Sequence, residues 1–216
     1  MNISAAADHN QLIARAAKAA LAPAGCKQKG RSRIWFADHG WWLAVIEFQP
    51  SSWEKGSYLN AAAMWLWNAK SHWSFDEGGR VEAFRAFRNE EQFSEAAEHI
   101  VASAAAEIAS LKERFPSIEA VAAYLERKQK IDIWDHYHAA LSSALVGRSA
   151  YAQSQFKKVA LTQAHAPWVE DIQAKAEILS KVALSIDDMR QAVTEEVIAA
   201  RILLKLPPIS KGNLWA

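Results

Sequence analysis

Several residue types that often direct a functional assignment are scarce or balanced in this sequence. Cys26 is the single cysteine among 216 residues, which excludes an intrachain disulfide. Lys+Arg 25 against Asp+Glu 24 leaves no bulk charge that would favour nucleic acid or an anionic membrane. Asp8, Arg15 and Lys18 interrupt the N-terminal alanines, and no apolar run reaches the roughly 18 residues of a membrane span. We therefore expect a cytoplasmic protein without a membrane segment.

Sequence patterns of catalytic and cofactor sites are also missing. The chain has no P-loop, G-x-G-x-x-G, G-x-S-x-G or H-E-x-x-H pattern, and no histidine is indicated as a partner for Cys26. The nearest approach to a metal site is IDIWDHYH, which contains Asp135, His136 and His138. That segment has a helical pattern, and on a helix two residues i and i+2 point about 200° apart. We therefore expect neither a metal ion nor a cofactor.

Tryptophan and alanine divide the chain into two parts near residue 116. Seven of the ten tryptophans fall between Trp35 and Trp73, whereas alanine and helical periodicity dominate after Glu90. A chain of this length can bury a sizeable core without metals or disulfides. We predict an α+β domain over residues 1–116, with a small antiparallel sheet packed by two helices. An all-α region of about four or five antiparallel helices should follow over residues 117–216.

The strand predictions rest on short apolar runs separated by turn-forming residues. The segments 41–49 (WWLAVIEFQ) and 58–67 (YLNAAAMWLW) suit two strands that are covered on both faces. Between them lies PSSWEKGS, a loop of about eight residues rich in turn formers, which predicts an antiparallel hairpin. A further strand begins at residues 34–36, and another is predicted over 72–76 before a turn at 76–79. Residues 80–88 fit either a strand or a helical turn.

The helix predictions rest on apolar stripes and capping residues. The longest helix should follow Asn89, which forms a capping-box pattern with Gln92, and continue for about 25 residues to Phe115. A first helix is expected over about residues 4–21. Tetratricopeptide spacing is not met in GRSAYAQSQFKKVA, so we favour a plain bundle or helices packed on the preceding domain. The remaining helices are predicted to begin at Ser117, Asp132, Ser149, Pro167 and Ser185, the last ending at Pro207.

Polar residues on otherwise apolar strands mark a candidate site. Glu47 and Gln49 share a strand face with apolar residues, and Asn60 occupies a similar position on the next strand. The hairpin would place all three near its loop end, and polar groups beside aromatic surface are typical of a ligand pocket. The turn predicted at 76–79 adds Glu77 and Glu82 as further neighbours. The predicted ligand-binding residues are Glu47, Gln49, Trp53, Asn60, Asp76 and Arg80.

Three interpretations of this cluster are open. In the first, Glu47 and Arg80 form a structural ion pair and the tryptophans are simply core. In the second, the cluster binds a ligand or partner without chemistry. In the third, Glu47 is a general acid or base on an apolar face, while Gln49, Asn60 and Arg80 orient a substrate.

A basic segment offers a separate hypothesis. Lys27, Lys29, Arg31 and Arg33 recur at every second position, so in an extended strand they would all project from one side. Such a row could hold the phosphates of a nucleic acid, with Trp35 available for base stacking. The simpler interpretation is a solvated edge strand that its charges protect from aggregation.

The order of these segments resembles the bacterial domain of unknown function 4304 family. The resemblance covers about residues 10–115, and its most specific element is FQPS, residues 48–51. The other segments that carry it are GCKQKGRSRIWF, YLNAAAMWLW, SFDEGGRVEAF and the helix opening NEEQF. It implies an α+β domain in a bacterial cytoplasmic protein, with no established activity and no catalytic residues to carry over.

As function, we predict a non-enzymatic binding or protein-interaction module. Its partner would be a protein or a small ligand, recognised by the aromatic hairpin or by the helical region. One alternative is a small-molecule enzyme that uses Glu47 with Arg80. The other is nucleic-acid binding through residues 27–33.

Overall fold

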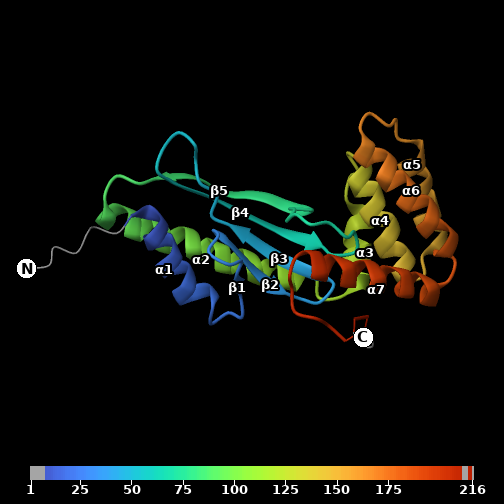
Figure 1. Cartoon of the computed structure of the whole chain (residues 1–216), viewed down its shortest axis with the longest axis horizontal. Helices are drawn as coiled ribbons and strands as arrows, with labels where there is room; N and C mark the ends of the chain where they lie inside the picture. Colours follow the sequence, from blue (N-terminus) through green and yellow to red (C-terminus); the bar gives the residue numbers. More distant parts are fainter. Residues whose placement is uncertain (1–7, 211–213, 216) are drawn as a thin grey trace, which may run out of the picture. The chain divides into compact units, whose positions relative to one another are not determined.

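The computed structural model describes residues 8–210 and 214–215, which fall into two compact units divided between Glu113 and Arg114 (Figure 1). The first unit contains α1 (His9–Leu21), β1 (Lys27–Gln28), β2 (Ile34–Asp38), β3 (Trp42–Glu47), β4 (Gly56–Trp65), β5 (Glu77–Ala86) and α2 (Glu90–Arg114). The second contains α3 (Ile118–Arg127), α4 (Ile133–Leu145), α5 (Ser149–Leu161), α6 (Pro167–Val182) and α7 (Ile186–Leu203). The predicted α+β class, a small antiparallel sheet followed by a helical region, is confirmed.

The sheet is a five-stranded antiparallel meander with the strands in chain order. The β3–β4 hairpin predicted around PSSWEKGS is confirmed. The β3–β4 register pairs Glu47 with Asn60, and the β4–β5 register pairs Asn60 with Arg80. Residues that are directly opposite in antiparallel strands share a face and lie within contact distance. The sheet register therefore brings three predicted site residues side by side.

A β-bulge divides the polar residues of β5 between the two faces of the sheet. Arg80 pairs with Asn60, whereas Glu82 pairs with Leu59. Val81 is therefore an extra residue in β5, because Asn60 and Leu59 are adjacent in β4. Regular alternation would place Arg80 and Glu82 on the same face. With the bulge, Arg80 shares the face of Asn60, and Glu82 instead accepts a hydrogen bond of 3.0 Å from Ser103 of α2.

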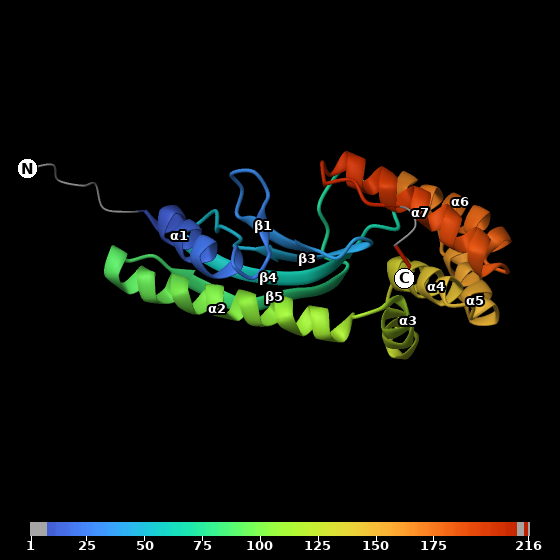
Figure 2. The same cartoon turned by 90° about the horizontal axis from the view of Figure 1, so that it is seen from below.

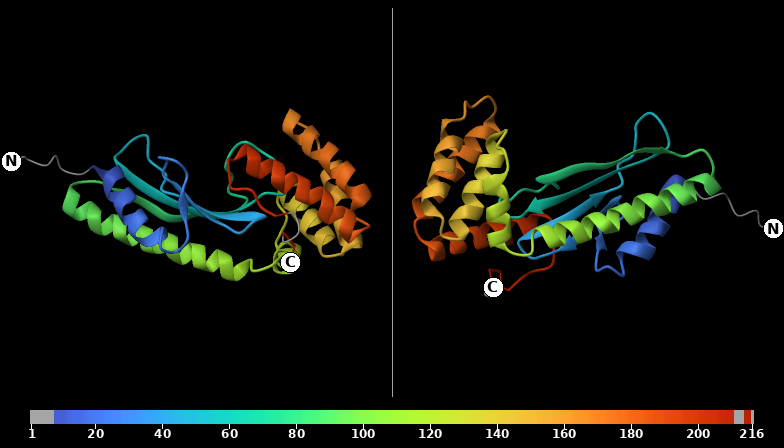
Figure 3. Two further views of the ribbon diagram at one scale, coloured as in Figure 1. Left: turned by 60° about the horizontal axis from the view of Figure 1, so that its bottom comes forward. Right: turned by 180° about the vertical axis from the view of Figure 1, so that it is seen from behind.

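Helices α1 and α2 lie side by side along the sheet (Figures 2 and 3). The sheet face that carries Leu59 and Glu82 meets α2, and on it Ile46 and Leu59 are fully buried. The 25-residue length of α2 matches the prediction, and Asn89 Oδ1 accepts from the Gln92 backbone N–H at 2.9 Å. The opposite face carries Asn60 and Arg80 at its loop end, while Val45 and Met64 farther along the same face are fully buried.

The region before β5 differs from the prediction. Residues 72–76 form no strand, and β5 runs through Gly78 and Gly79, where a turn was expected. The reason is close backbone approach: a Cβ on Gly78 would lie 2.3 Å from the carbonyl oxygen of Ala61. Gly78 also has φ +142°, a conformation that side chains disfavour. Both glycines are therefore part of strand β5. Of the two alternatives for residues 80–88, strand is correct as far as Ala86.

Most predicted helix starts are found as expected, and one is wrong. Ser117, Asp132 and Ser185 each accept a backbone N–H as N-caps, and Pro167 opens α6. Ser149 is instead the first residue of α5, and Arg148 occupies the cap position without a side-chain bond. Helix α1 begins after its cap Asp8, and the start predicted near residue 4 lies outside the described residues. Over the described ranges, no helix is long and apolar enough to cross a bilayer.

The stability of the protein should fall in mild acid because of His9. Its ring lies 5.9 Å from that of Phe87 and 6.2 Å from that of Phe93. Burial first, and then the charge of Arg33, hold the pKa of His9 below its ordinary value of 6.5. The unfolded chain therefore binds a proton before the folded protein does, so the free energy of unfolding should decline as the pH falls below about 6.5.

Urea denaturation between about pH 7.5 and pH 5.5 measures this effect. The variant His9→Phe should keep the aromatic packing and lose part of the decline. Burial also lowers the pKa of His39, so some decline should remain. The variant His165→Phe, at an exposed position, is the control and should behave as the unmodified protein. An unchanged pH dependence in His9→Phe would contradict the assignment.

Candidate functional site

Four of the predicted site residues form one hydrogen-bonded cluster, which we call the polar network: Glu47, Gln49, Asn60 and Arg80. The amide of Asn60 donates from Nδ2 to Glu47 Oε2 at 2.9 Å and to Gln49 Oε1 at 3.0 Å. Arg80 donates from Nε to Asn60 Oδ1 and from Nη2 to Gln49 Oε1, both at 2.7 Å. Arg80 is exposed and the other three are half-buried, so the network lies at the surface of the sheet.

Asn60 lies between the two charged groups of the polar network. It donates to Glu47 and accepts from Arg80. The acceptors of the Arg80 guanidinium are thus the amide oxygens of Asn60 and Gln49. The direct ion pair between Glu47 and Arg80 that the sequence suggested is replaced by an amide-bridged arrangement.

Tyr58 completes the cluster, although the sequence did not single it out as a site residue. The Arg80 Cζ lies 3.9 Å from the centroid of the Tyr58 ring, a cation–π stacking distance. The centroid of the Tyr58 ring is also 5.0 Å from that of the Phe84 ring. Tyr58 precedes Asn60 by two positions and shares its strand face, and this spacing was the signal available in the sequence.

Asp76 and Glu82 have other roles. Asp76 Oδ2 accepts the backbone N–H of Trp65 at 2.8 Å, and Asp76 Oδ1 pairs with Lys70 at 3.0 Å. Trp65 ends β4 at the opposite end from the loop, so Asp76 is not part of the polar network. Glu82 bonds with Arg85 at 2.9 Å on the helix-covered face. The sequence grouped these residues because it implied a turn at 76–79. Instead, Asp76 lies just before β5, and the bulge at Val81 places Glu82 on the other face.

Trp53 lies in the β3–β4 loop and is 96% exposed. The loop extends beyond the sheet in Figure 1, between the labelled strands β3 and β4. Backbone bonds close its base, from Tyr58 N to Gln49 O at 2.9 Å and from Phe87 N to Lys55 O at 2.8 Å. The loop therefore has a fixed base, beside the polar network, and an exposed indole.

The basic segment does not form the extended row that the alternation suggested. Gly30, with φ +56°, lies in a turn closed by bonds from Ser32 N to Lys29 O at 3.0 Å and from Lys29 N to Ile34 O at 2.9 Å. The chain reverses between Lys27 and Ile34, so the four basic residues do not project from one strand face. The alternation was misleading because a glycine turn interrupts it.

Arg33 is bound within the fold. Its Nη1 donates to the backbone carbonyls of Phe48 and Gly56, both at 3.2 Å. Its Nε donates to Asn10 Oδ1 at 2.9 Å, and its Nη2 donates to the same oxygen. Lys29 Nζ lies 5.0 Å from the centroid of the Trp73 ring. Arg33 therefore joins helix α1 to the base of the β3–β4 loop.

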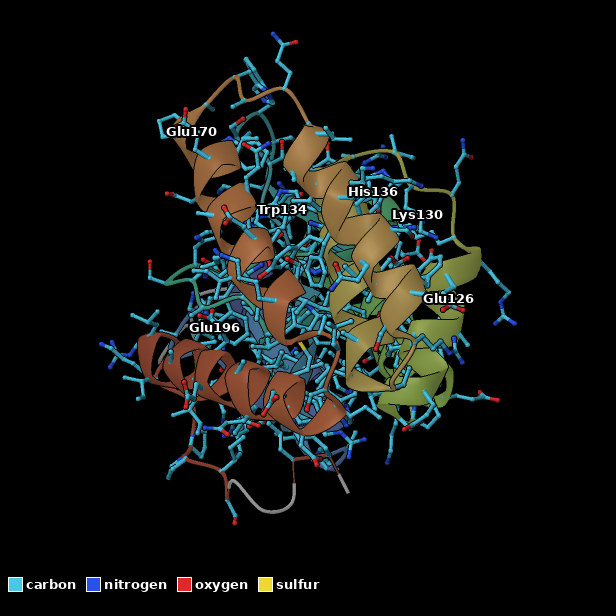
Figure 4. All side chains as sticks on the ribbon, turned by 90° about the vertical axis from the view of Figure 1, so that its right-hand side faces the viewer. Glu126, Lys130, Trp134, His136, Glu170 and Glu196 are labelled. Carbon is cyan, nitrogen blue, oxygen red and sulfur yellow. The ribbon has the colours of Figure 1, made fainter. Side chains whose placement is uncertain are left out.

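The two histidines of IDIWDHYH contact different groups in the helical unit, where Figure 4 labels His136 and Trp134. His136 Nδ1 is 2.8 Å from Gln155 Oε1, while the His138 ring stacks on Trp134 with centroids 5.8 Å apart. Asp135 accepts from the Ile131 backbone N–H at 2.8 Å, within the cap of α4. In the part of the chain that the structure describes, no three metal-ligating side chains come together.

Two cavities of the molecule are lined by other residues. One, of about 410 Å³, lies between α1 and α2 and is bordered by Arg15 and Glu98. The other, of about 490 Å³, lies between α5 and α6 and is bordered by Lys157 and Glu177. Neither cavity is lined by a residue of the polar network.

Comparison with protein-family models, with curated proteins and with solved structures found no match to this chain. The resemblance to the domain of unknown function 4304 family therefore stays a prediction.

Proposed function

We propose that this chain is a non-enzymatic protein-interaction module whose main contact with a partner protein is Trp53. The observation that carries the proposal is the 96% exposure of this side chain on a loop with a fixed base. An exposed indole presents a large apolar surface for a partner to bury, and tryptophan is enriched among residues that dominate binding energy. A loop that is already ordered loses little conformational entropy on binding.

The polar network supplies the polar surroundings that such a contact needs. Gln49 belongs both to the loop base, through its backbone carbonyl, and to the network, through its side chain. Arg80 and Glu47 add one positive and one negative charge on the same sheet face. Charges around an apolar contact select the partner and its orientation more than they add affinity.

The other two functions have less support. An enzyme would need Glu47 available to a substrate, whereas its carboxylate accepts the Asn60 amide at 2.9 Å within the polar network. Nucleic-acid binding would need an exposed basic row, and Arg33 is instead bound to Asn10, Phe48 and Gly56. We propose the bacterial cytoplasm as the setting, on the strength of the resemblance and the composition.

The variant Trp53→Ala should lose the partner. In an extract of the source organism, the full unmodified chain used as bait should retain at least one partner protein. The Trp53→Ala bait should retain at least about tenfold less of that partner, since truncating a central tryptophan commonly costs 2 kcal/mol or more of binding free energy. Quantitative mass spectrometry of the retained proteins measures this ratio. The mutated side chain is exposed, so the fold and its stability should be unchanged.

Leu184→Ala provides the matched control. Leu184 is 74% exposed in the second unit, so its truncation removes a comparable exposed apolar side chain elsewhere on the chain. The control bait should retain the same partner as the unmodified protein. If the Trp53→Ala bait retains every protein at the unmodified level, Trp53 is not the contact and the proposal fails.

A further inference from the structure

The guanidinium of Arg80 uses one of its two hydrogen-bonding edges within the protein. Nε and Nη2, which form that edge, donate to the amide oxygens of Asn60 and Gln49. A guanidinium carries five N–H donors, so the outer edge, formed by Nη1 and the second N–H of Nη2, faces away from these two bonds. Two parallel N–H groups on one edge match the two oxygens of a carboxylate.

Three contacts hold Arg80 in a fixed orientation. Asn60 and Gln49 fix the inner edge in the plane of the guanidinium, and the Tyr58 ring supports one face at 3.9 Å. A free arginine side chain loses about 2 kcal/mol of rotamer entropy when a ligand immobilises it. Here the fold has already imposed much of that cost, which favours binding at the outer edge.

The charges around Arg80 select a singly charged anion. Both acceptors of its inner edge are neutral amides, so neither of these bonds brings a negative charge into direct contact with the guanidinium. Glu47 lies one amide away on the same face, because Asn60 bonds to both residues. A second negative charge on a ligand would be repelled by Glu47, which disfavours a phosphate dianion relative to a carboxylate.

The aromatic neighbours add an apolar requirement. The Tyr58 ring beneath Arg80 continues into Phe84, 5.0 Å away, and both side chains are half-buried. We propose that Arg80 binds a carboxylate with an apolar group beside it, the chemistry of a chain terminus or acidic side chain next to an apolar residue. The proposal depends on the proposed function only in treating this face as a binding surface, since it concerns Arg80 and not Trp53.

N-acetylphenylalanine tests the proposal, with N-acetylphenylalanine amide as the neutral match. In nuclear magnetic resonance titrations of the full chain, the carboxylate should cause saturable shifts of the Arg80 Nε–H and the Gln49 side-chain amide. The amide probe should bind at least about tenfold more weakly, because it lacks the charge that the fork recognises. An acetylated phenylalanyl-aspartate with an amidated C-terminus presents a side-chain carboxylate and separates the two sources.

Arg80→Lys removes the planar fork and keeps the charge, so its affinity for N-acetylphenylalanine should fall at least about tenfold. Arg85→Lys is the control: Arg85 is exposed on the same strand and already paired with Glu82, so this variant should bind as the unmodified protein does. Equal binding of acid and amide, unchanged binding in Arg80→Lys, or equally tight binding of inorganic phosphate would each overturn the proposal. None of these results depends on the partner retained through Trp53, so the two proposals can fail separately.

Discussion

Gly78→Ala should lower the free energy of unfolding of the first unit by about 3 kcal/mol or more. The added Cβ would lie 2.3 Å from the backbone oxygen of Ala61 and 2.7 Å from the Cα of Ala62. Backbone atoms cannot rotate away as the end of a side chain can, so β4 and β5 would have to separate. The φ of +142° adds strain for any residue with a Cβ.

Gly79→Ala is the matched control for this substitution. A Cβ on Gly79 would meet nothing within 4 Å, so its effect should stay within about 1 kcal/mol. Urea denaturation followed by tryptophan fluorescence measures both, because seven of the ten tryptophans lie between Trp35 and Trp73. Similar stabilities for the two variants would contradict the close approach of β5 to β4.

Arg33→Ala should lower the free energy of unfolding by about 2 to 4 kcal/mol. A hydrogen bond from a charged donor contributes about 1.5 to 3 kcal/mol, and the several bonds of one guanidinium are not additive. The loss leaves the carbonyls of Phe48 and Gly56 and the side chain of Asn10 without this donor. Burial lowers the pKa of Arg33, in keeping with a structural position. The expected consequence is looser attachment of α1 to the base of the β3–β4 loop.

Arg31→Ala is the matched control, because Arg31 is exposed in the turn between β1 and β2. Its stability should differ from that of the unmodified protein by less than about 0.5 kcal/mol. The pair also tests the nucleic-acid alternative. Salt-dependent binding of an oligonucleotide that Arg31→Ala weakens, with Arg33→Ala as stable as the unmodified protein, would reverse our assignment of the two arginines.

The sequence predicted the centre of the site because two strands had clear limits. Glu47, Gln49 and Asn60 interrupt apolar runs at positions where a covered strand has no need of polar groups, and a hairpin necessarily brings the strands together. The predicted hairpin is present, and the hydrogen bonds of Asn60 join all three. Local alternation and turn chemistry were sufficient for this part.

The neighbours of that centre depended on features that local patterns do not reveal. Gly78 and Gly79 are typical of a turn, and only the approach of the Ala61 backbone explains their place inside a strand. The bulge at Val81 places Arg80 and Glu82 on opposite faces of the sheet, whereas simple alternation places them together. Such irregularities arise from the packing of neighbouring strands, which a single sequence does not specify.

Amide hydrogen exchange of the full chain, with and without the partner retained through Trp53, tests whether the β3–β4 loop and the surface around Arg80 form the interaction surface. We predict that the partner slows exchange in residues 49–60, which contain the loop, and in residues 80–84 of β5. Burial of Trp53 and of the surface around Arg80 by the partner would produce this pattern. Protection confined to the helices of the second unit, with unchanged exchange in the loop, would contradict the proposed interaction surface.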